Sequence, residues 1–361
     1  MTINNLIDPI MLDFLTELPK CEHHCHLEGT LSPSLLFKLA KKNSVKLPDE
    51  FPDTPEKLLL KYDNFENLDD FLKYYYVGMN VLITEDDFFE LAWNYLLTAK
   101  SQGVYHLELF FDPQGHLIRS IKISFDTIIN GLTRAFLKAK NELEISTKLT
   151  MCILRHLPLD SCFETINLSK KYYENGQIHG LGLDSSEKPF PPTLFKECYS
   201  EISKTFPNVG LTAHAGEEGG PDFVVDSINE LKVTRIDHGV NSIKDLNLID
   251  YLSKNQILLT VCPISNLKLQ VIKNLDQLPL NEFLKYNVPF SINSDDPAYF
   301  NSYILDNYAQ IQKAFNWNIE TWCKIANNSI NGSWIADKEK ELLLLKVDQV
   351  YHKYKSIMSD L

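Results

Sequence analysis

Short apolar runs alternate along the whole chain with longer stretches in which apolar residues recur at helical spacing. An alternation of this kind is typical of repeated strand–helix units around a parallel sheet. Eight apolar runs have the length of a buried strand, and a helical stretch follows each of them: residues 21–27, 104–110, 148–154, 178–183, 210–214, 235–238, 258–262 and 288–292. Eight such units predict an α/β fold, specifically a (β/α)8 or TIM barrel.

One connection is much longer than the others. Residues 32–100, between the first and second predicted strands, keep helical spacing and predict a helical insertion. An insertion at this place can cover the mouth of a barrel as a lid. Aromatic stripes on helices usually serve the core, so helix packing is the first interpretation of one aromatic run, with a contact at the mouth as the alternative. The run consists of Phe71, Tyr74, Tyr75 and Tyr76.

The chain after the eighth predicted strand shows three further helical stretches, which we expect to close the domain: residues 303–315, 319–330 and 338–354. No stretch rich in proline, glycine or serine, and no block of charge, divides the 361 residues. Residues 1–361 are therefore predicted to form one domain, with a length that suits a barrel carrying insertions.

Composition narrows the classes of partner. The formal net charge of −13 would repel a phosphate backbone, so nucleic acid is disfavoured and a small, neutral or cationic ligand fits better. No apolar run approaches the ~18 residues that span a bilayer, which disfavours a membrane partner.

With no basic cluster in residues 1–10, we expect a cytoplasmic location, with the nucleus as an alternative. The seven cysteines include no Cys-x-x-Cys pair and predict reduced, packed thiols, while the oligomeric state stays open.

The first predicted strand carries two histidines on one face. His24 and His26 alternate with His23 and Cys25, and successive side chains of a strand point to opposite faces. Two imidazoles at the end of a strand can chelate one metal ion, although the same pattern also occurs in hydrogen-bonded core histidines. The pattern therefore needs partners from elsewhere in the chain.

Further polar residues stand at the ends of other predicted strands. Three motifs follow the fifth, sixth and eighth strands: His214-Ala215-Gly216-Glu217, Asp237-His238-Gly239 and Ser294-Asp295-Asp296-Pro297. In a βα barrel the carboxyl ends of the strands meet at one mouth, so residues far apart in sequence can meet there. Four histidines and two aspartates are therefore predicted to lie at that rim.

In their order along the chain, these motifs resemble those of the adenosine and adenine deaminase family: His-x-His-Leu-Glu-Gly, His-Ala-Gly-Glu, Asp-His-Gly and Ser-Asp-Asp-Pro. The resemblance covers nearly the whole length of the chain. It implies a TIM-barrel hydrolase that uses one zinc ion per chain to remove the exocyclic amino group of a small purine, a step of purine salvage.

The resemblance also implies a role for each residue of the rim. Four residues are the expected zinc ligands and leave one position for water: His24, His26, His214 and Asp295. The metal would lower the pKa of that water from ~15.7 towards ~7, so that it attacks C6 of the purine. Glu217 is expected to protonate ring N1, and His238 to orient the water. Asp296 is expected to accept the water's proton or to contact the imidazole edge of the purine.

One further residue and one loop are predicted to contact the substrate. Adenosine deaminases usually carry an aspartate that contacts the ribose where this chain has Glu28, whose longer side chain could instead approach the base near N9. The loop after the fourth strand also differs, since it begins Asp184-Ser185-Ser186-Glu187 and is shorter than the family's Leu-Ala-Gly-Asp-Glu loop.

Contact with the base is therefore predicted for Asp184, Ser185, Ser186 and Glu187, with loop capping as an equal alternative. Residues 111–114, which read Phe-Asp-Pro-Gln after the second strand, carry the same two interpretations. These features resemble the fungal-type adenine deaminases and favour adenine over adenosine as the substrate.

Other functions differ from this one in specific residues. Deamination of adenosine would require only that aspartate and glutamate be interchangeable at position 28. A binuclear amidohydrolase would need a bridging lysine at the end of the fourth strand, but the nearest, Lys188, lies well into the loop. A purine-binding barrel without activity would be expected to lack the acid or a ligand, and neither is missing. The zinc deaminase design with His-x-Glu and Pro-Cys-x-x-Cys is excluded, because the second motif is absent.

Overall fold

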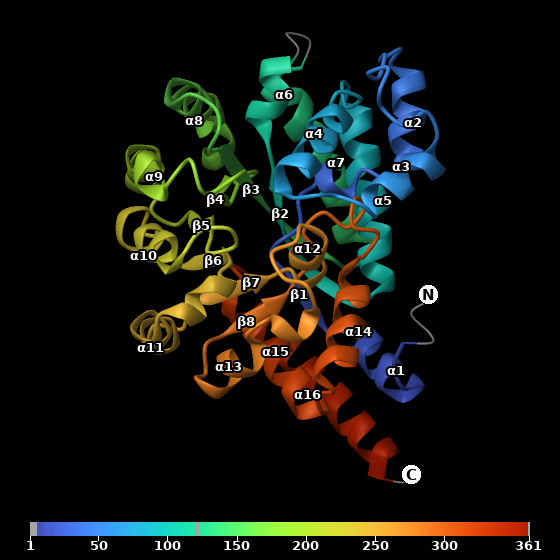
Figure 1. Ribbon diagram of the computed structural model, residues 1–361, viewed down its shortest axis with the longest axis vertical. Coiled ribbons are helices and arrows are strands. Elements are labelled where there is room, and N and C mark those ends of the chain that lie inside the picture. The colour runs from blue at the N-terminus through green and yellow to red at the C-terminus, as the bar shows by residue number, and fades with distance from the viewer. Residues whose placement is uncertain (1–5, 120–122, 360–361) are drawn as a thin grey trace.

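The computed structural model describes residues 6–119 and 123–359. Its centre is an eight-stranded parallel sheet in the order β1-β2-β3-β4-β5-β6-β7-β8, which curves into a nearly closed barrel surrounded by helices (Figure 1). The strands are β1 (Lys20–Glu22), β2 (Val104–Phe111), β3 (Ser146–Leu154), β4 (Gly180–Asp184), β5 (Gly210–Ala215), β6 (Arg235–His238), β7 (Leu258–Val261) and β8 (Phe290–Ile292). All eight predicted strands are present, and the predicted TIM barrel is confirmed.

The first strand is shorter than predicted, because β1 ends at Glu22 and the chain beyond it pairs with its neighbours only at isolated bridges. In this segment Asp295 N donates to His24 O at 3.0 Å, and His26 N donates to Asp295 O at 2.9 Å. These bonds join the chain after β1 to the chain after β8 and so close the barrel. The predicted alternation nevertheless persists, since the rings of His24 and His26 lie together with their centroids 5.5 Å apart.

Helices cover the outside of the barrel and follow its strands in turn. They are α6 (Pro113–Arg119), α7 (Phe125–Glu142), α8 (Leu159–Glu174), α9 (Lys196–Thr205), α10 (Pro221–Glu230), α11 (Leu246–Lys254), α12 (Pro263–Lys268) and α13 (Leu280–Lys285). In the described part of the chain, four 3-10 turns lie between these elements: η2 (Glu28–Thr30), η3 (Pro192–Phe195), η4 (Val240–Lys244) and η5 (Leu275–Gln277). With helices outside and side chains inside, the strands are buried on both faces, which explains why they read as continuous apolar runs.

The amino-terminal end of the barrel is closed by Trp334. A Cβ at Gly210 would lie 2.3 Å from its ring, and the guanidinium of Arg235 lies 3.9 Å from the ring centroid. The fully buried Glu108 accepts hydrogen bonds from Arg235 Nη1 and, at 3.1 Å, from His106 Nε2. A buried ionic network therefore forms the floor of the barrel, at the end opposite the predicted rim.

The predicted insertion between β1 and β2 consists of four helices: α2 (Pro33–Lys42), α3 (Pro55–Tyr62), α4 (Leu68–Met79) and α5 (Glu85–Ser101). Each helix begins directly after a side chain that accepts hydrogen bonds from its free backbone N–H groups. These capping residues are Ser32, Thr54, Asn67 and Thr84. Side chains of α4 line a cavity at the carboxyl ends of the strands, so the insertion reaches the mouth of the barrel.

The two ends of the chain pack against each other. Three helices follow β8, close to the predicted ranges: α14 (Ile304–Phe315), α15 (Ile319–Gly332) and α16 (Asp337–Ser359). Helix α1 (Pro9–Glu17) lies beside α16 (Figure 1). Lys353 Nζ is 2.6 Å from Glu17 Oε1, and the rings of Phe14 and Tyr354 have centroids 5.5 Å apart. These contacts tie the amino-terminal helix to the domain.

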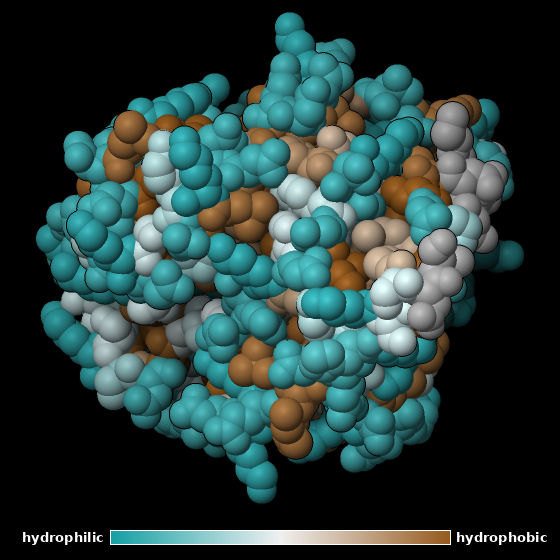
Figure 2. Space-filling view, turned by 90° about the horizontal axis from the view of Figure 1, so that it is seen from below, coloured by the Kyte–Doolittle hydropathy of each residue, from teal (hydrophilic) through white to brown (hydrophobic). Residues whose placement is uncertain are grey.

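The surface is mostly polar on the face shown in Figure 2, where hydrophobic residues appear in separate patches. Within the described ranges, no helix is both long enough and apolar enough to cross a membrane. The seven cysteines are free thiols, six of them buried, as the sequence predicts.

Replacing Glu108 with alanine should destabilise the barrel through its floor. The substitution leaves the buried charge of Arg235 without its carboxylate, and breaking a buried pair in this way typically costs ~3–5 kcal/mol. Urea unfolding followed by circular dichroism measures the loss in the free energy of unfolding. As a control, Asp250→Ala breaks the exposed pair with Lys254 and should leave that free energy unchanged. Equal stability of Glu108→Ala and wild type would show that the floor network contributes nothing.

Candidate active site

A cavity of about 50 Å³ lies at the carboxyl ends of the strands. Its wall combines residues at or just after the ends of seven strands, β1, β2, β3, β4, β5, β6 and β8, with residues of α4 and with Leu269, which follows α12. The polar residues of the wall are His26, Asp112, Asp184, Ser185, Glu187, His214, Glu217, His238, Asp295 and Asp296. Of the site residues predicted from the sequence, only His24 and Glu28 do not line this cavity.

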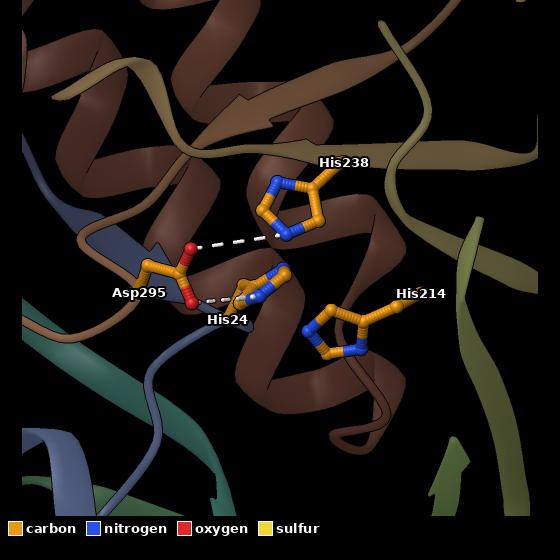
Figure 3. Close-up of side chains that lie close together, drawn as sticks. All are labelled: His24, His214, His238 and Asp295. Carbon is orange, nitrogen blue, oxygen red and sulfur yellow. Dashed lines mark ion pairs between the residues drawn. The ribbon is translucent and has the colours of Figure 1, made fainter. Parts of the chain in front are cut away.

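Four buried side chains converge in the arrangement shown in Figure 3: His24, His214, His238 and Asp295. One potential donor atom of each lies within 4.8 Å of the other three. Asp295 Oδ1 is 3.2 Å from His24 Nε2, and Asp295 Oδ2 is 3.8 Å from His238 Nε2. His26 reaches the same carboxylate, with its Nε2 3.3 Å from Oδ1. Four imidazoles therefore lie around Asp295, one more than the predicted ligand set contains.

One carboxylate pairs with the outer ring nitrogens of two of these histidines. Asp184, the last residue of β4, places Oδ2 3.3 Å from His26 Nδ1 and Oδ1 3.0 Å from His214 Nδ1. A carboxylate at this position keeps the proton on Nδ1 and leaves the lone pair of Nε2 free to bind a metal. This position of Asp184 would suit both imidazoles to act as metal ligands. Because Asp184 also lines the cavity, its contact with a base stays a prediction.

His24 is oriented by a chain of polar side chains from three strands. Its Nδ1 lies 2.9 Å from Thr260 Oγ1, which donates to Asp237 Oδ1 at 3.0 Å. Thr212 Oγ1 donates to the other oxygen of Asp237 at 2.7 Å. Among the described residues, the buried Nε2 of His24 finds no hydrogen-bond partner. A buried polar atom without a partner is costly, and a metal ion beside Asp295 would satisfy this nitrogen.

His238 is less suited to bind a metal than the other three histidines. The amide nitrogen Nδ2 of Asn266 lies 3.5 Å from His238 Nδ1, a contact that suits the tautomer in which Nδ1 accepts and Nε2 carries the proton. This Nε2 faces Glu217 Oε2 at 3.4 Å and Asp295 Oδ2 at 3.8 Å. Burial lowers the pKa of His238 and keeps its ring neutral. The ring thus presents a hydrogen-bond donor to the site, which suits the predicted role of orienting water.

His238 and Asp295 have a backbone conformation that is rare outside glycine. The φ angles of His238 and Asp295 are +65° and +64°, in the left-handed region. Such a conformation costs ~1–3 kcal/mol and persists only where the surrounding structure enforces it. Gly29 is required nearby for a steric reason, since a Cβ there would lie 2.1 Å from Asp296 Oδ1. These local constraints set the direction of the rim side chains.

Glu217 lies in the loop after β5 with its carboxyl group buried. Its Oε1 accepts a hydrogen bond from Asn266 Nδ2 at 2.9 Å. Burial raises the pKa of Glu217 well above its usual range, and the negative charges of Asp295, Glu187 and Glu218 act in the same direction. Because burial favours the protonated form of this carboxyl group, it is suited to serve as a proton donor.

Asp296 has a similar electrostatic environment. Burial and, next, the charge of Asp295 raise the pKa of Asp296 well above its usual range. Its Oδ1 is buried and has no hydrogen-bond partner in the part of the chain that the structure describes. Asp296 also lines the cavity, so a bound molecule meets a carboxyl group whose protonated form is favoured by burial.

Glu28 lies behind the wall of the cavity and supports it. Its Oε1 accepts hydrogen bonds from His116 Nε2 at 2.8 Å and from Asp112 N at 3.0 Å. Asp112 does line the cavity, and Tyr75 of α4 donates to its Oδ2 at 3.1 Å. The predicted contact between Glu28 and a base would therefore have to use Oε2, which has no partner within the described ranges.

The β4 loop and α4 form the rim of the cavity. Ser185, with a φ of +77°, lines the cavity and its Oγ lies 2.9 Å from His156 Nδ1. Phe71, Tyr75 and Tyr76 of α4 line the cavity as well, and the rings of Phe71 and Tyr75 pack with centroids 5.5 Å apart. The interpretation of this aromatic run as helix packing alone is therefore incomplete, because the run also serves the mouth.

Sequence reasoning missed several residues that hold the site in place. Thr212 and Thr260 are polar residues within otherwise apolar strands, and Thr212 lies two positions before His214, on the same face. That polar exception in a buried run is the signal that could have identified them. Asn266 follows β7 and gives no comparable signal, since asparagine is common in loops.

The amino-acid sequence of this chain matches a known protein family and named relatives. The model of a family described as adenosine deaminase matches residues 19–350. A protein named adenine deaminase from Candida glabrata is 56% identical over 94% of this chain and 98% of the relative. The protein of that name from Saccharomyces cerevisiae is 54% identical over 96% of this chain and 99% of the relative.

Two solved structures are similar to this chain in fold. The crystal structure of adenine deaminase from Arthrobacter aurescens has a TM-score of 0.87 and 36% identity, and the match covers 92% of this chain and 98% of that chain. An amidohydrolase from Burkholderia ambifaria, solved with bound Zn, also has a TM-score of 0.87, covering 97% of this chain and 96% of that one. At 21% identity, the second match supports the barrel fold alone.

Replacing Asp184 with asparagine should weaken zinc binding although no ligand atom is lost. The amide keeps only one acceptor oxygen, so either His26 or His214 loses its partner. Removing such a partner typically lowers metal affinity ~10–100-fold. Titration of the metal-free protein against a chromogenic zinc chelator measures the affinity. The exposed Asp222→Asn is the matched control, and equal affinities of the two variants would contradict this role of Asp184.

Proposed function

Because the chain belongs to the adenosine deaminase family, we propose that it hydrolyses free adenine to hypoxanthine and ammonia with one zinc ion per chain. The observation that carries this proposal is the set of imidazoles whose outer nitrogens face an oxygen and whose inner nitrogens lie around Asp295, beside the buried carboxyl group of Glu217. The names of the relatives support the choice of adenine as the substrate.

Zinc fits the donor set that the sequence predicts. His24, His26 and His214 would bind through Nε2, since each Nδ1 already faces an oxygen, and Asp295 would add a carboxylate oxygen. Three nitrogen ligands and one carboxylate suit zinc. Such an ion supplies Lewis acidity, which makes water nucleophilic near neutral pH. In the alternative set His238 replaces His26, and it would turn a protonated nitrogen towards the metal, so we assign His238 to the water.

The residues around this centre move the protons of the reaction. His238 directs a water molecule towards C6 of the purine, and Glu217 protonates N1 as electron density moves onto it. Asp296 donates to the imidazole edge of the purine, the role that its raised pKa favours over acceptance of the water's proton. The water gives up two protons in all. One ends on the amino group and the other restores the proton that Glu217 gave to N1, while the bond from C6 to the amino group breaks, so that ammonia leaves and hypoxanthine remains.

The walls of the cavity favour a free base over a nucleoside. Side chains of α4 cover the cavity. Glu28 holds the backbone of Asp112, whose buried Oδ1 has no partner among the described residues. In free adenine an N–H of the five-membered ring can donate to this oxygen, whereas adenosine carries ribose there. A site that must hydrogen-bond an N–H group rejects an analogue without it far more strongly than size alone would.

Adenosine is the second candidate substrate, because the description of the matching family model names adenosine deaminase. A binuclear metal site is a weaker candidate. Its donors would be His26, Asp112 and Asp184, which lie within 4.8 Å of one another. However, Asp184 already pairs with His26 and His214 through both oxygens, so we propose a single zinc ion.

Glu217→Gln should keep the fold and the zinc but lower kcat by about 10²–10⁴-fold, since an amide cannot supply the proton to N1. Ammonia release from adenine and elemental analysis of the same sample measure the two properties. His24→Ala should show the reverse order and lose zinc first. If Glu217→Gln loses its zinc while the remaining loaded fraction turns over normally, Glu217 is a ligand and not the acid.

The wild-type protein should have a higher kcat/KM for adenine than for adenosine, and Glu28→Asp should reduce that preference. The shorter side chain withdraws its carboxylate from His116 and from Asp112 N, which frees the wall that faces the base. A change of one methylene is worth about 10–200-fold in discrimination. A wild-type preference for adenosine would refute the substrate assignment. If the preference is unchanged in Glu28→Asp, Glu28 does not determine the choice between the two substrates, and the loop after β4 becomes the next candidate.

A further inference from the structure

Glu187 is a buried carboxylate whose oxygens are both used by the backbone of another loop. Its side chain is 2% exposed and lies in the wall of the cavity. Oε1 accepts hydrogen bonds from Glu217 N at 2.8 Å and Glu218 N at 3.2 Å. Oε2 accepts from Gly216 N at 2.9 Å and Gly219 N at 3.2 Å. The loop at residues 216–219 thus forms a nest of consecutive N–H groups around one anion, and that anion belongs to the chain itself.

The carbonyl side of the same loop is held as well. Asn241 Nδ2 donates to Glu217 O at 2.9 Å and to Gly219 O at 2.8 Å. A further hydrogen bond runs in the opposite direction, since Glu218 Oε2 accepts from Glu187 N at 3.0 Å. With its N–H groups and its carbonyl groups both engaged, the backbone that carries Glu217 has one well-defined position.

The sequence of the loop suits the approach of this carboxylate. A Cβ at Gly219 would lie 2.6 Å from Phe223 Cγ and 2.7 Å from Glu187 Oε2, so a larger residue there would push against the carboxylate and the ring. Precise placement matters for Glu217, because a proton donor must lie within hydrogen-bond reach of the atom that it protonates. A displacement of about 1 Å in an active site can cost about 10²-fold in rate.

We propose that Glu187 is a positioning residue of the deamination reaction, which holds residues 216–219 so that the carboxyl group of Glu217 meets N1 of the purine. This inference rests on the proposed function. Glu187 acts through Glu217 and does not touch the reacting atoms, because both of its oxygens are occupied by backbone N–H groups. Of the two interpretations that the sequence leaves for the loop after β4, Glu187 follows loop capping.

Glu187→Gln tests the proposal with the smallest change in shape. It replaces one acceptor oxygen by an amide NH2 group, which cannot accept hydrogen bonds from the two backbone N–H groups that it faces. We expect kcat to fall about 10–100-fold while KM stays within about threefold and the zinc content equals that of wild type. Hydrogen exchange measured by mass spectrometry on the peptide that contains residues 216–219 should become at least about tenfold faster, since the loop opens more readily.

The decisive measurement repeats the substitution in the Glu217→Gln background. If Glu187 acts through Glu217, the second substitution should lower the remaining kcat less than about twofold. A loss of general stability would instead lower kcat equally in both backgrounds, and that result would overturn the proposal. Unchanged kcat and unchanged exchange in Glu187→Gln would overturn it too. Glu197→Gln, on the exposed side of α9, is the matched control and should leave kcat and exchange as in wild type.

The two proposals can fail separately in this experiment. The wild-type protein is assayed first with adenine and with adenosine. If it deaminates only adenosine, the substrate assignment is wrong, while the same comparison of variants with adenosine still decides the role of Glu187. If it deaminates neither purine, both proposals are overturned.

Discussion

The closure of the barrel and the position of the candidate ligands depend on the same backbone hydrogen bonds. The chain after β8 joins the chain after β1 through bonds between Asp295 and the residues His24 and His26. The left-handed φ of Asp295 turns its carboxylate back towards the two imidazoles that the pairing has brought beside it. A parallel barrel can close only when all its strands are in register, so these donors are placed by the whole core and not by a loop.

Around that edge, buried polar groups restrict one another to single orientations. Asp184 faces two imidazoles, Asp237 accepts from two threonine hydroxyls, and Glu187 accepts a row of backbone N–H groups. A buried charge without a partner is costly, and each pairing therefore selects one rotamer and one protonation state. Asp296 Oδ1 and His24 Nε2 remain without partners in the described residues, and both lie where the proposed reaction needs them.

The barrel and its rim can be predicted from the sequence for physical reasons. These reasons do not apply to the supporting residues, which hold the candidate ligands and the candidate acid in place. Strands buried on both faces must be apolar, so their positions can be read directly, and reactive residues after them stand out. The end of β1 could not be predicted, because the extended chain beyond Glu22 keeps the same alternation as a strand. The direction of Glu28 could not be predicted either, since its partner His116 comes from α6, across the strand β2.

Supporting residues are hard to read from a sequence because a carboxylate can serve several partners equally well. Glu187 and Asp184 are three positions apart in one loop, yet one faces backbone N–H groups and the other faces imidazoles. Between them Ser185 has a left-handed backbone, and Ser186 Oγ donates to Asp69 of α4 at 2.8 Å. This short loop therefore contacts the candidate ligands, the candidate lid and the loop of the candidate acid, each through a different residue. Such a division of contacts follows from the turn at Ser185, and a conformation of that kind is set by the tertiary structure, since serine itself does not favour it.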